Sequence, residues 1–393
     1  MKNVSLENKR ILSIDVLRGI TILVMIWVNE MSSVINISPL MKHMPADADK
    51  MTFVDVVFPG FLFLVGMSIP FAINHRLLKG DSKMQLYKHI LIRTIGLLVL
   101  GIFMVNGGTA FDESQMIISI ALWNFLAFVF AILIWNMYPK TMNETTIKVL
   151  KVIGIVGLIV LFFLYKGENG NMMQVHWWGI LGLIGLAYFF SSFIYIFSKG
   201  NLILLISAIV LLTGFFALGK TKFPSLSFMM SLEHATHSTI TLSGVVVSLL
   251  FFNKKISATL MQRVKYVVGF VLALLLAGFL LRPYFTISKI WATPTWCFYS
   301  VGIMTALFLV LYYVLDVKNK TNWSNWMKPA ATNPLLIYIL PYILISIQKM
   351  LGFSIVPEFA TSGIQGILWT FGFALLMVWV VKWFNKFNIR LHL

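Results

Sequence analysis

Residues 53–74 read FVDVVFPGFLFLVGMSIPFAIN. This run is long and apolar enough to cross the roughly 30 Å hydrocarbon core of a bilayer as a helix. Similar runs recur along the whole chain of 393 residues, of which 59% are hydrophobic and only 11% are charged. A soluble globular protein carries about 25% charged residues. The composition therefore predicts an all-α, polytopic integral membrane protein and excludes soluble, coiled-coil, disordered and nucleic-acid-binding proteins.

Twelve apolar segments divide the chain, and we expect them to form a single transmembrane helical domain over residues 1–393. Basic residues precede the first segment as they do in a signal peptide, but no small-residue cleavage site follows, so we interpret it as a retained span. The segments cover residues 14–34, 53–74, 89–106, 116–138, 147–166, 177–197, 201–219, 236–253, 264–282, 294–315, 333–351 and 364–386.

The formal net charge of +17 is concentrated in the short loops between these segments. With twelve spans, 22 Lys and Arg residues fall on the side that also holds both termini, and 8 fall on the other side. Basic loops mark the cytoplasmic face of a membrane protein and meet anionic lipid headgroups. We therefore expect both termini to be cytoplasmic.

The first segment contains charged residues that are costly inside a membrane. Arg10, Asp15 and Arg18 cluster at its inner end, and a buried charge costs about 2.5–3.5 kcal/mol on insertion scales. Asp15 and Arg18 are three residues apart, so on a helix they share a face and can pair. The cluster is either a structural ion pair or part of a basic pocket for an anionic ligand, such as a phosphate-bearing cofactor.

A second polar group gathers at the opposite ends of the first two segments. Asn29 ends the first segment, Asp55 begins the second, and His43 lies in the loop between them. We expect these three side chains to converge at one outer-leaflet site. A histidine whose ring is oriented by a carboxylate is suited to act as a general base.

Three stretches carry a family resemblance: RILSIDVLRGITILVMIWVN at residues 10–29, Lys42-His43, and FVDVVFPGFLFLVGMSI from residue 53. They resemble the heparan-α-glucosaminide N-acetyltransferase family and its bacterial relatives, within the wider transmembrane acyltransferase superfamily. The most specific motifs lie within residues 10–75, with weaker similarity at residues 287–296 and 332–340. The resemblance implies a multi-pass protein of the bacterial cytoplasmic (inner) membrane and a possible homodimer.

The resemblance also implies a reaction, in which an acetyl group passes from cytoplasmic acetyl-CoA to the amine of a glucosamine-type sugar outside. It places the catalytic histidine on His43, its partner on Asn29 and a supporting acid on Asp55, and it implies no metal. The cofactor-binding residues are expected to be Arg10, Asp15, Arg18, Arg93 and Asn333, with the arginines on the CoA phosphates, although Asn333 can equally be a helix cap. An amino-sugar or N-acetylglucosamine transporter is the alternative function, since kinked helices with central polar residues also suit a carrier.

The remaining polar and aromatic residues on the outer side are candidates for binding the acceptor sugar. His234 and His237 share a helix face, so that with Glu233 or His176 they are alternatively a zinc site or ordinary interfacial residues. Tryptophan can stack on a sugar ring or belong to the interfacial aromatic belt. The acceptor-site candidates are His176, Glu233, His234, His237, Lys289 and Trp291, with Trp296 as a further stacking residue. Cys297 is the only cysteine, which excludes an intrachain disulfide, and we expect it to be buried.

Overall fold

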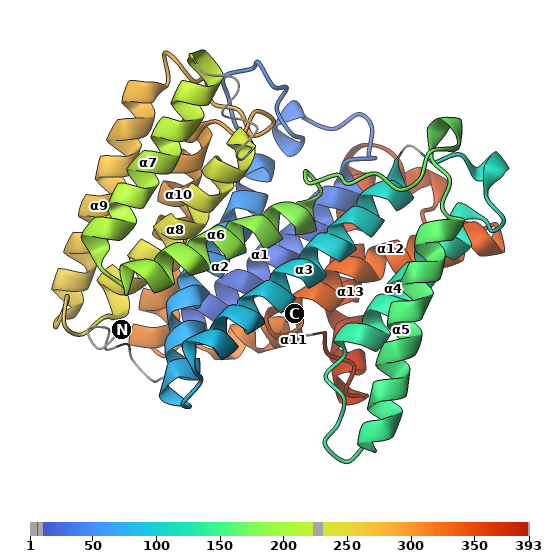
Figure 1. The fold of residues 1–393 in the computed structure, drawn as a ribbon. Helices are drawn as coiled ribbons and strands as arrows, with labels where there is room; N and C mark the ends of the chain where they lie inside the picture. Colours follow the sequence, from blue (N-terminus) through green and yellow to red (C-terminus); the bar gives the residue numbers. More distant parts are fainter. Residues whose placement is uncertain (1–5, 7–10, 110, 223–230, 392–393) are drawn as a thin grey trace. The chain divides into compact units, whose positions relative to one another are not determined.

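The computed structural model describes residues 6, 11–109, 111–222 and 231–391 (Figure 1). Within these ranges the chain is all-helical and contains no β-strand beyond isolated bridges. The long helices are α1 (Leu12–Met31), α2 (Phe53–Leu78), α3 (Lys83–Gly108), α4 (Ile120–Trp135), α5 (Glu144–Leu164), α6 (Ile180–Ser198), α7 (Leu202–Thr221), α8 (Leu232–Phe252), α9 (Leu260–Leu281), α10 (Pro294–Tyr312), α12 (Pro334–Leu351) and α13 (Gly363–Lys386). Short elements include η1 (Pro39–Met41), the π-helical turn η5 (Tyr313–Val317) that extends α10, and α11 (Lys328–Thr332).

Each of the twelve predicted segments corresponds to one long helix. Eleven helices in the described ranges are long and apolar enough to cross a membrane, so the chain is a polytopic membrane protein. The exception is α4, which has 16 residues and is shorter than the predicted segment 116–138. Ser119 caps the start of α4 by accepting a hydrogen bond from the Leu122 amide, and Asn136 ends it with an extended backbone.

The described residues form two compact units, each assembled from three stretches of chain. The first comprises Met1–Thr21, Ser38–Thr94 and Ile184–Asn325, and the second comprises Ile22–Ile37, Ile95–Leu183 and Trp326–Leu393. Three of the five boundaries between the stretches fall within α1, α3 and α6, and the other two fall in the loop before η1 and in the 3-10 helix Asn322–Met327.

Helix α8 is the core of the first unit. All its residues from His234 to Phe252 are buried, because α8 packs against α2, α7, α9 and α10 (Figure 1). Helices α2 and α8 approach closely at two glycines. A Cβ atom at Gly66 would overlap the Thr241 carbonyl, and one at Gly244 would overlap the Phe63 carbonyl. Small residues allow such close approach of membrane helices, and here they hold the middle of α2 against α8.

In the second unit, α4 packs against α5 and α12, and α12 packs against α13. Trp123 is fully buried between α4 and α5, where its indole N–H donates to the Leu161 carbonyl at 2.8 Å. Asn106 ties α3 to the loop before α6, since its amide donates to the Gln174 carbonyl and accepts from the Gln174 N–H. These buried polar contacts fix the loops of this unit on its helices.

Candidate active site

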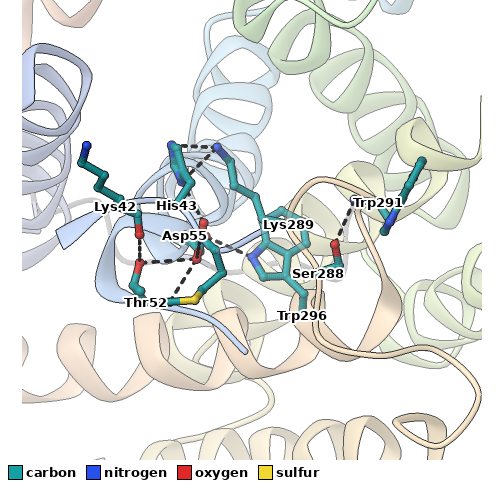
Figure 2. Close-up of polar contacts among 9 residues, drawn as sticks. Lys42, His43, Thr52, Asp55, Ser288, Lys289, Trp291 and Trp296 are labelled. Atoms are coloured by element: carbon teal, nitrogen blue, oxygen red, sulfur yellow. Dashed lines mark hydrogen bonds and ion pairs between the residues drawn. The ribbon is translucent and has the colours of Figure 1, made fainter. Parts of the chain in front are cut away.

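His43 and Asp55 form a close pair in the first unit, as the sequence predicts. Nδ1 of His43 lies 2.7 Å from Oδ1 of Asp55 (Figure 2). The Asp55 side chain is 1% exposed, whereas the His43 side chain is 40% exposed. A buried carboxylate that accepts from Nδ1–H leaves Nε2 as the free base of the neutral imidazole. The imidazole can therefore accept a proton at Nε2, the nitrogen that Lys289 also contacts.

The local sequence explains why Asp55 is held so firmly. Thr52 precedes α2 and Asp55 occupies its third position, the spacing at which an acidic side chain reaches back to the backbone before the helix. Oδ2 of Asp55 accepts from the Thr52 N–H at 3.0 Å and from the Met44 N–H at 3.3 Å. One carboxylate thus fixes the helix start with Oδ2 and the histidine ring with Oδ1.

Lys289 joins this pair from the loop between α9 and α10. Its Nζ lies 3.0 Å from Nε2 and 3.3 Å from Nδ1 of His43 (Figure 2). Burial lowers the pKa of Lys289 from its ordinary value, while Asp55 acts in the opposite direction. The predicted sugar contact of Lys289 stays a prediction; in the structure its ammonium group lies beside the imidazole of His43.

The fully buried Trp296 supports the site from below. Its indole N–H donates to the backbone carbonyl of Asp55 at 3.0 Å. Thr293 and Pro294 begin α10 just before it, with the Thr293 hydroxyl accepting from the Ser288 N–H in the Lys289 loop. Trp296 is therefore a buried packing residue behind Asp55 and does not offer a surface for sugar stacking. Trp291 is 55% exposed, packs under Lys220 and lies apart from His43 in Figure 2.

An ion pair that sequence reasoning missed joins the two loops of the site. Arg282 contacts both carboxylate oxygens of Asp49, and Asp49 also accepts from the Ile287 N–H at 2.8 Å. The hydrogen bond from Arg282 and then that from Ile287 hold the pKa of Asp49 below its ordinary value. The pair thereby connects the His43 loop to the Lys289 loop.

His234 and His237 are buried at the start of α8, 5% and 3% exposed. The His237 ring packs edge-on against Phe58 and Trp296, and Nδ1 of each histidine has no hydrogen-bond partner among the residues described. Glu233 lies in the same helical turn. His176 belongs to the second unit, where its ring packs on Trp178. Within the described ranges no three His, Cys, Asp or Glu residues are grouped as metal ligands.

Asn29 belongs to the second unit, whereas His43 and Asp55 belong to the first, so their convergence stays a prediction. Asn29 lines a cavity between α1 and α12. Asn333, at the start of α12, is fully buried, and its amide bonds to Asn385 and to the backbone of Ile389 and Leu391. These contacts give Asn333 a structural role in anchoring the C-terminal segment.

The Asp15–Arg18 pair predicted for the first helix is present, at 3.2 Å, and Arg18 also donates to Ser68 on α2 at 2.7 Å. Ser68 is 13 residues beyond Asp55 on α2, which at 1.5 Å per residue places this cluster about 20 Å along the helix from Asp55. Arg93 lies over the Tyr188 ring, and its Nε has no hydrogen-bond partner among the residues described. Arg10 lies outside the described residues.

The start of α1 is capped by a residue the sequence did not indicate. Asp316, in η5, accepts from the backbone N–H groups of Leu12 and Ser13 at 3.0 and 2.9 Å. An acidic group at a helix N-terminus stabilises the helix dipole. The first two amides of α1 are therefore already bonded within the protein.

A protein-family model matches residues 10–230, more than half of the chain. The family is described as a domain of unknown function, DUF5009. The chain belongs to this family. The match includes His43 and Asp55, whereas Arg282 and Lys289 lie beyond its end.

A stretch of 97 residues of this DUF5009 protein is 35% identical to heparan-alpha-glucosaminide N-acetyltransferase of Homo sapiens. The stretch makes up 25% of this chain and 14% of the human protein. The chain is thus similar to a small part of that transferase, and well under two thirds of the human protein is covered.

Proposed function

We propose that this DUF5009 protein is a membrane acetyltransferase that moves an acetyl group from acetyl-CoA to the amine of a glucosamine-type sugar. The observation that carries the proposal is the His43–Asp55 pair, with its carboxylate buried and its imidazole open. The similarity to an N-acetyltransferase supports the same reaction class. A bacterial cytoplasmic membrane, with donor and acceptor on opposite sides, completes the proposal.

In the proposed reaction the neutral acceptor amine attacks the thioester carbonyl, and a C–N bond replaces a C–S bond. Nε2 of His43 takes the proton that leaves the nitrogen, while Asp55 holds the ring and stabilises the imidazolium. The departing thiolate regains a proton from the imidazolium. Acetyl-CoA and the amine therefore give the N-acetyl product and the free thiol of CoA.

Lys289 blocks Nε2 in the structure, because its ammonium lies where the acceptor amine has to approach. We expect the acceptor to displace it. The displaced ammonium then remains close enough to stabilise the negative charge that develops on the carbonyl oxygen, and Asn29 is the second expected donor to that oxygen. Lys289 accordingly acts after the acceptor has bound.

The distance between the arginine cluster and Asp55 along α2 is suited to the extended acetyl-CoA donor. Arg18 and Ser68 lie about 20 Å from Asp55 along this helix, so a phosphate group held near Arg18, with Arg10 and Arg93, leaves the extended arm of CoA to reach His43. For the acceptor, the exposed ring of Trp291 is available for stacking. His237 packs against Trp296 beneath Asp55, and His234 and Glu233, in the same turn of α8, remain further candidates for acceptor contacts.

The test is acetyl transfer by the purified protein from labelled acetyl-CoA to glucosamine. We expect product with the unaltered chain and a loss of about 10²–10⁴-fold in His43→Ala, the usual contribution of a general base. The control is His75→Ala, an exposed histidine near the end of α2. Full activity in His43→Ala would rule out the assigned base, and sugar uptake into proteoliposomes without acetyl-CoA would favour a transporter.

A further inference from the structure

The second unit contains a cavity of about 280 Å³ between α1 and α12. Its polar lining comes from Asn29, Glu30 and Ser33 on one side and from Tyr338 and Tyr342 on the other. Residues 338, 341, 342 and 345 lie on one face of α12, and residues 26, 29 and 30 lie on one face of α1, with Ser33 in the turn after it. Two facing helical stripes therefore build the cavity.

The size of the cavity limits what it can hold. Pockets for drug-sized ligands measure about 300–1,000 Å³. A volume of 280 Å³ lies just below that range, which suits a molecule of monosaccharide size and is too small for a nucleotide with its phosphates. The cavity is therefore a candidate site for a small ligand and not for the CoA nucleotide.

Glu30 is the only charged residue of the lining, and it is half-buried. Its carboxylate has no hydrogen bond or ion pair within the part of the chain that the structure describes, although it lies close enough to Tyr342 to interact with that side chain electrostatically. A partly desolvated carboxylate without a partner is unfavourable. In a chain with a net charge of +17, a negative group left uncompensated at a cavity indicates a cationic ligand.

The aromatic lining favours an organic cation over a metal ion. The Tyr338 and Tyr342 rings lie 5.9 Å apart between centroids and are tilted by 59° to each other. Aromatic faces attract ammonium groups, and tyrosine hydroxyls and the Asn29 amide can bond to hydroxyl groups of a ligand. A calcium or magnesium ion would instead need several oxygen ligands, typically including more than one carboxylate. The lining of this cavity contains a single carboxylate.

We propose that the Glu30 cavity binds the primary ammonium of a small hydroxylated molecule of hexosamine size. This inference rests on the proposed function where it identifies that molecule as the amine acceptor. Glu30 pairs with the ammonium, the tyrosines contact the ring, and Asn29 bonds to a hydroxyl.

The test is calorimetric binding of glucosamine to the full chain in lipid nanodiscs, without acetyl-CoA. We expect glucosamine to bind at least about tenfold more tightly than glucose or N-acetylglucosamine, since a charge-assisted hydrogen bond contributes about 1.5–3 kcal/mol. This comparison needs no substitution. Equal binding of the three sugars, no binding of glucosamine, or competition by sodium ions as strong as by glucosamine overturns the inference.

Substitutions test whether Glu30 is the residue that binds the ammonium group. Glu30→Gln is expected to lose the preference for glucosamine, Glu30→Asp to keep most of it, and the exposed Glu144→Gln on α5 to bind as the unaltered chain does. If Glu30→Gln keeps the preference, the cavity assignment is wrong while acetyl transfer can still stand. If the unaltered chain transfers no acetyl group but shows binding that depends on Glu30, the proposed function fails and the ammonium site stands.

Discussion

Asp55 holds the His43 ring with one oxygen and the start of α2 with the other. In Asp55→Asn the amide oxygen can still accept from the backbone, but the negative charge that stabilises the imidazolium is gone. We expect acetyl transfer to fall about 10²–10⁴-fold with little change in Tm. The control is Asp47→Asn, which changes an exposed residue of the loop that contains His43. A variant that keeps its rate would show that Asp55 is only a helix cap.

A substitution at Lys289 is expected to lower activity without lowering the stability of the fold. Burial lowers its pKa in the folded protein, so the folded state binds this proton less tightly than the unfolded chain does. The charged lysine therefore opposes folding below its folded pKa, and this penalty disappears as the pH rises toward the unfolded value near 10.5. We predict that Lys289→Met lowers the transfer rate at pH 7 without lowering Tm, whereas exposed Lys50→Met changes neither. A lower Tm with full activity would contradict this account.

How much of the site can be predicted from sequence depends on separation along the chain. His43 and Asp55 are 12 residues apart and the helix start between them is recognisable. The Arg282–Asp49 and Asp316–Leu12 contacts join residues 233 and 304 positions apart, and no local sequence pattern predicts such contacts. Lys289 was identified as a site residue, but its place at Nε2 of His43 depends on the fold of its loop.

At the scale of elements, the close crossing of α2 and α8 determines where the site sits. A methyl group at Gly66 would overlap the Thr241 backbone, so Gly66→Ala has to push the helices apart, at a cost of about 1–3 kcal/mol. Gly269 on α9 is exposed with open space around it, so Gly269→Ala is expected to be neutral or slightly stabilising. Thermal unfolding in detergent compares the two. Equal Tm values would refute this close packing.

The hydropathy pattern predicted all twelve long helices, because apolar runs of this length are too hydrophobic to be loops exposed to water. It predicted a segment longer than α4, where Ser119 and Asn136 terminate the helix inside an apolar stretch. The pattern also gave no sign of η5, although Asp316 caps α1 from that turn. Helix ends depend on single polar contacts, which average hydropathy does not record.

At the scale of the whole molecule, the basic loops predict that the two ends of α2 lie on opposite sides of the membrane. Cys297 is buried, so a background of Cys297→Ala allows single cysteines to be placed at exposed Lys50 and Lys79. We expect an impermeant maleimide to label Lys50→Cys in intact cells and Lys79→Cys only after lysis. Labelling of both, or the reverse order, would mean that the orientation is wrong.

The most direct test of the central claim loads acetyl-CoA inside right-side-out membrane vesicles and supplies glucosamine outside. The account predicts that N-acetylglucosamine forms outside, that it requires acetyl-CoA inside, and that vesicles with His43→Ala form at least about a hundredfold less. Product that forms only when both substrates share one side, or that forms equally well without His43, would contradict transfer across the membrane at this site.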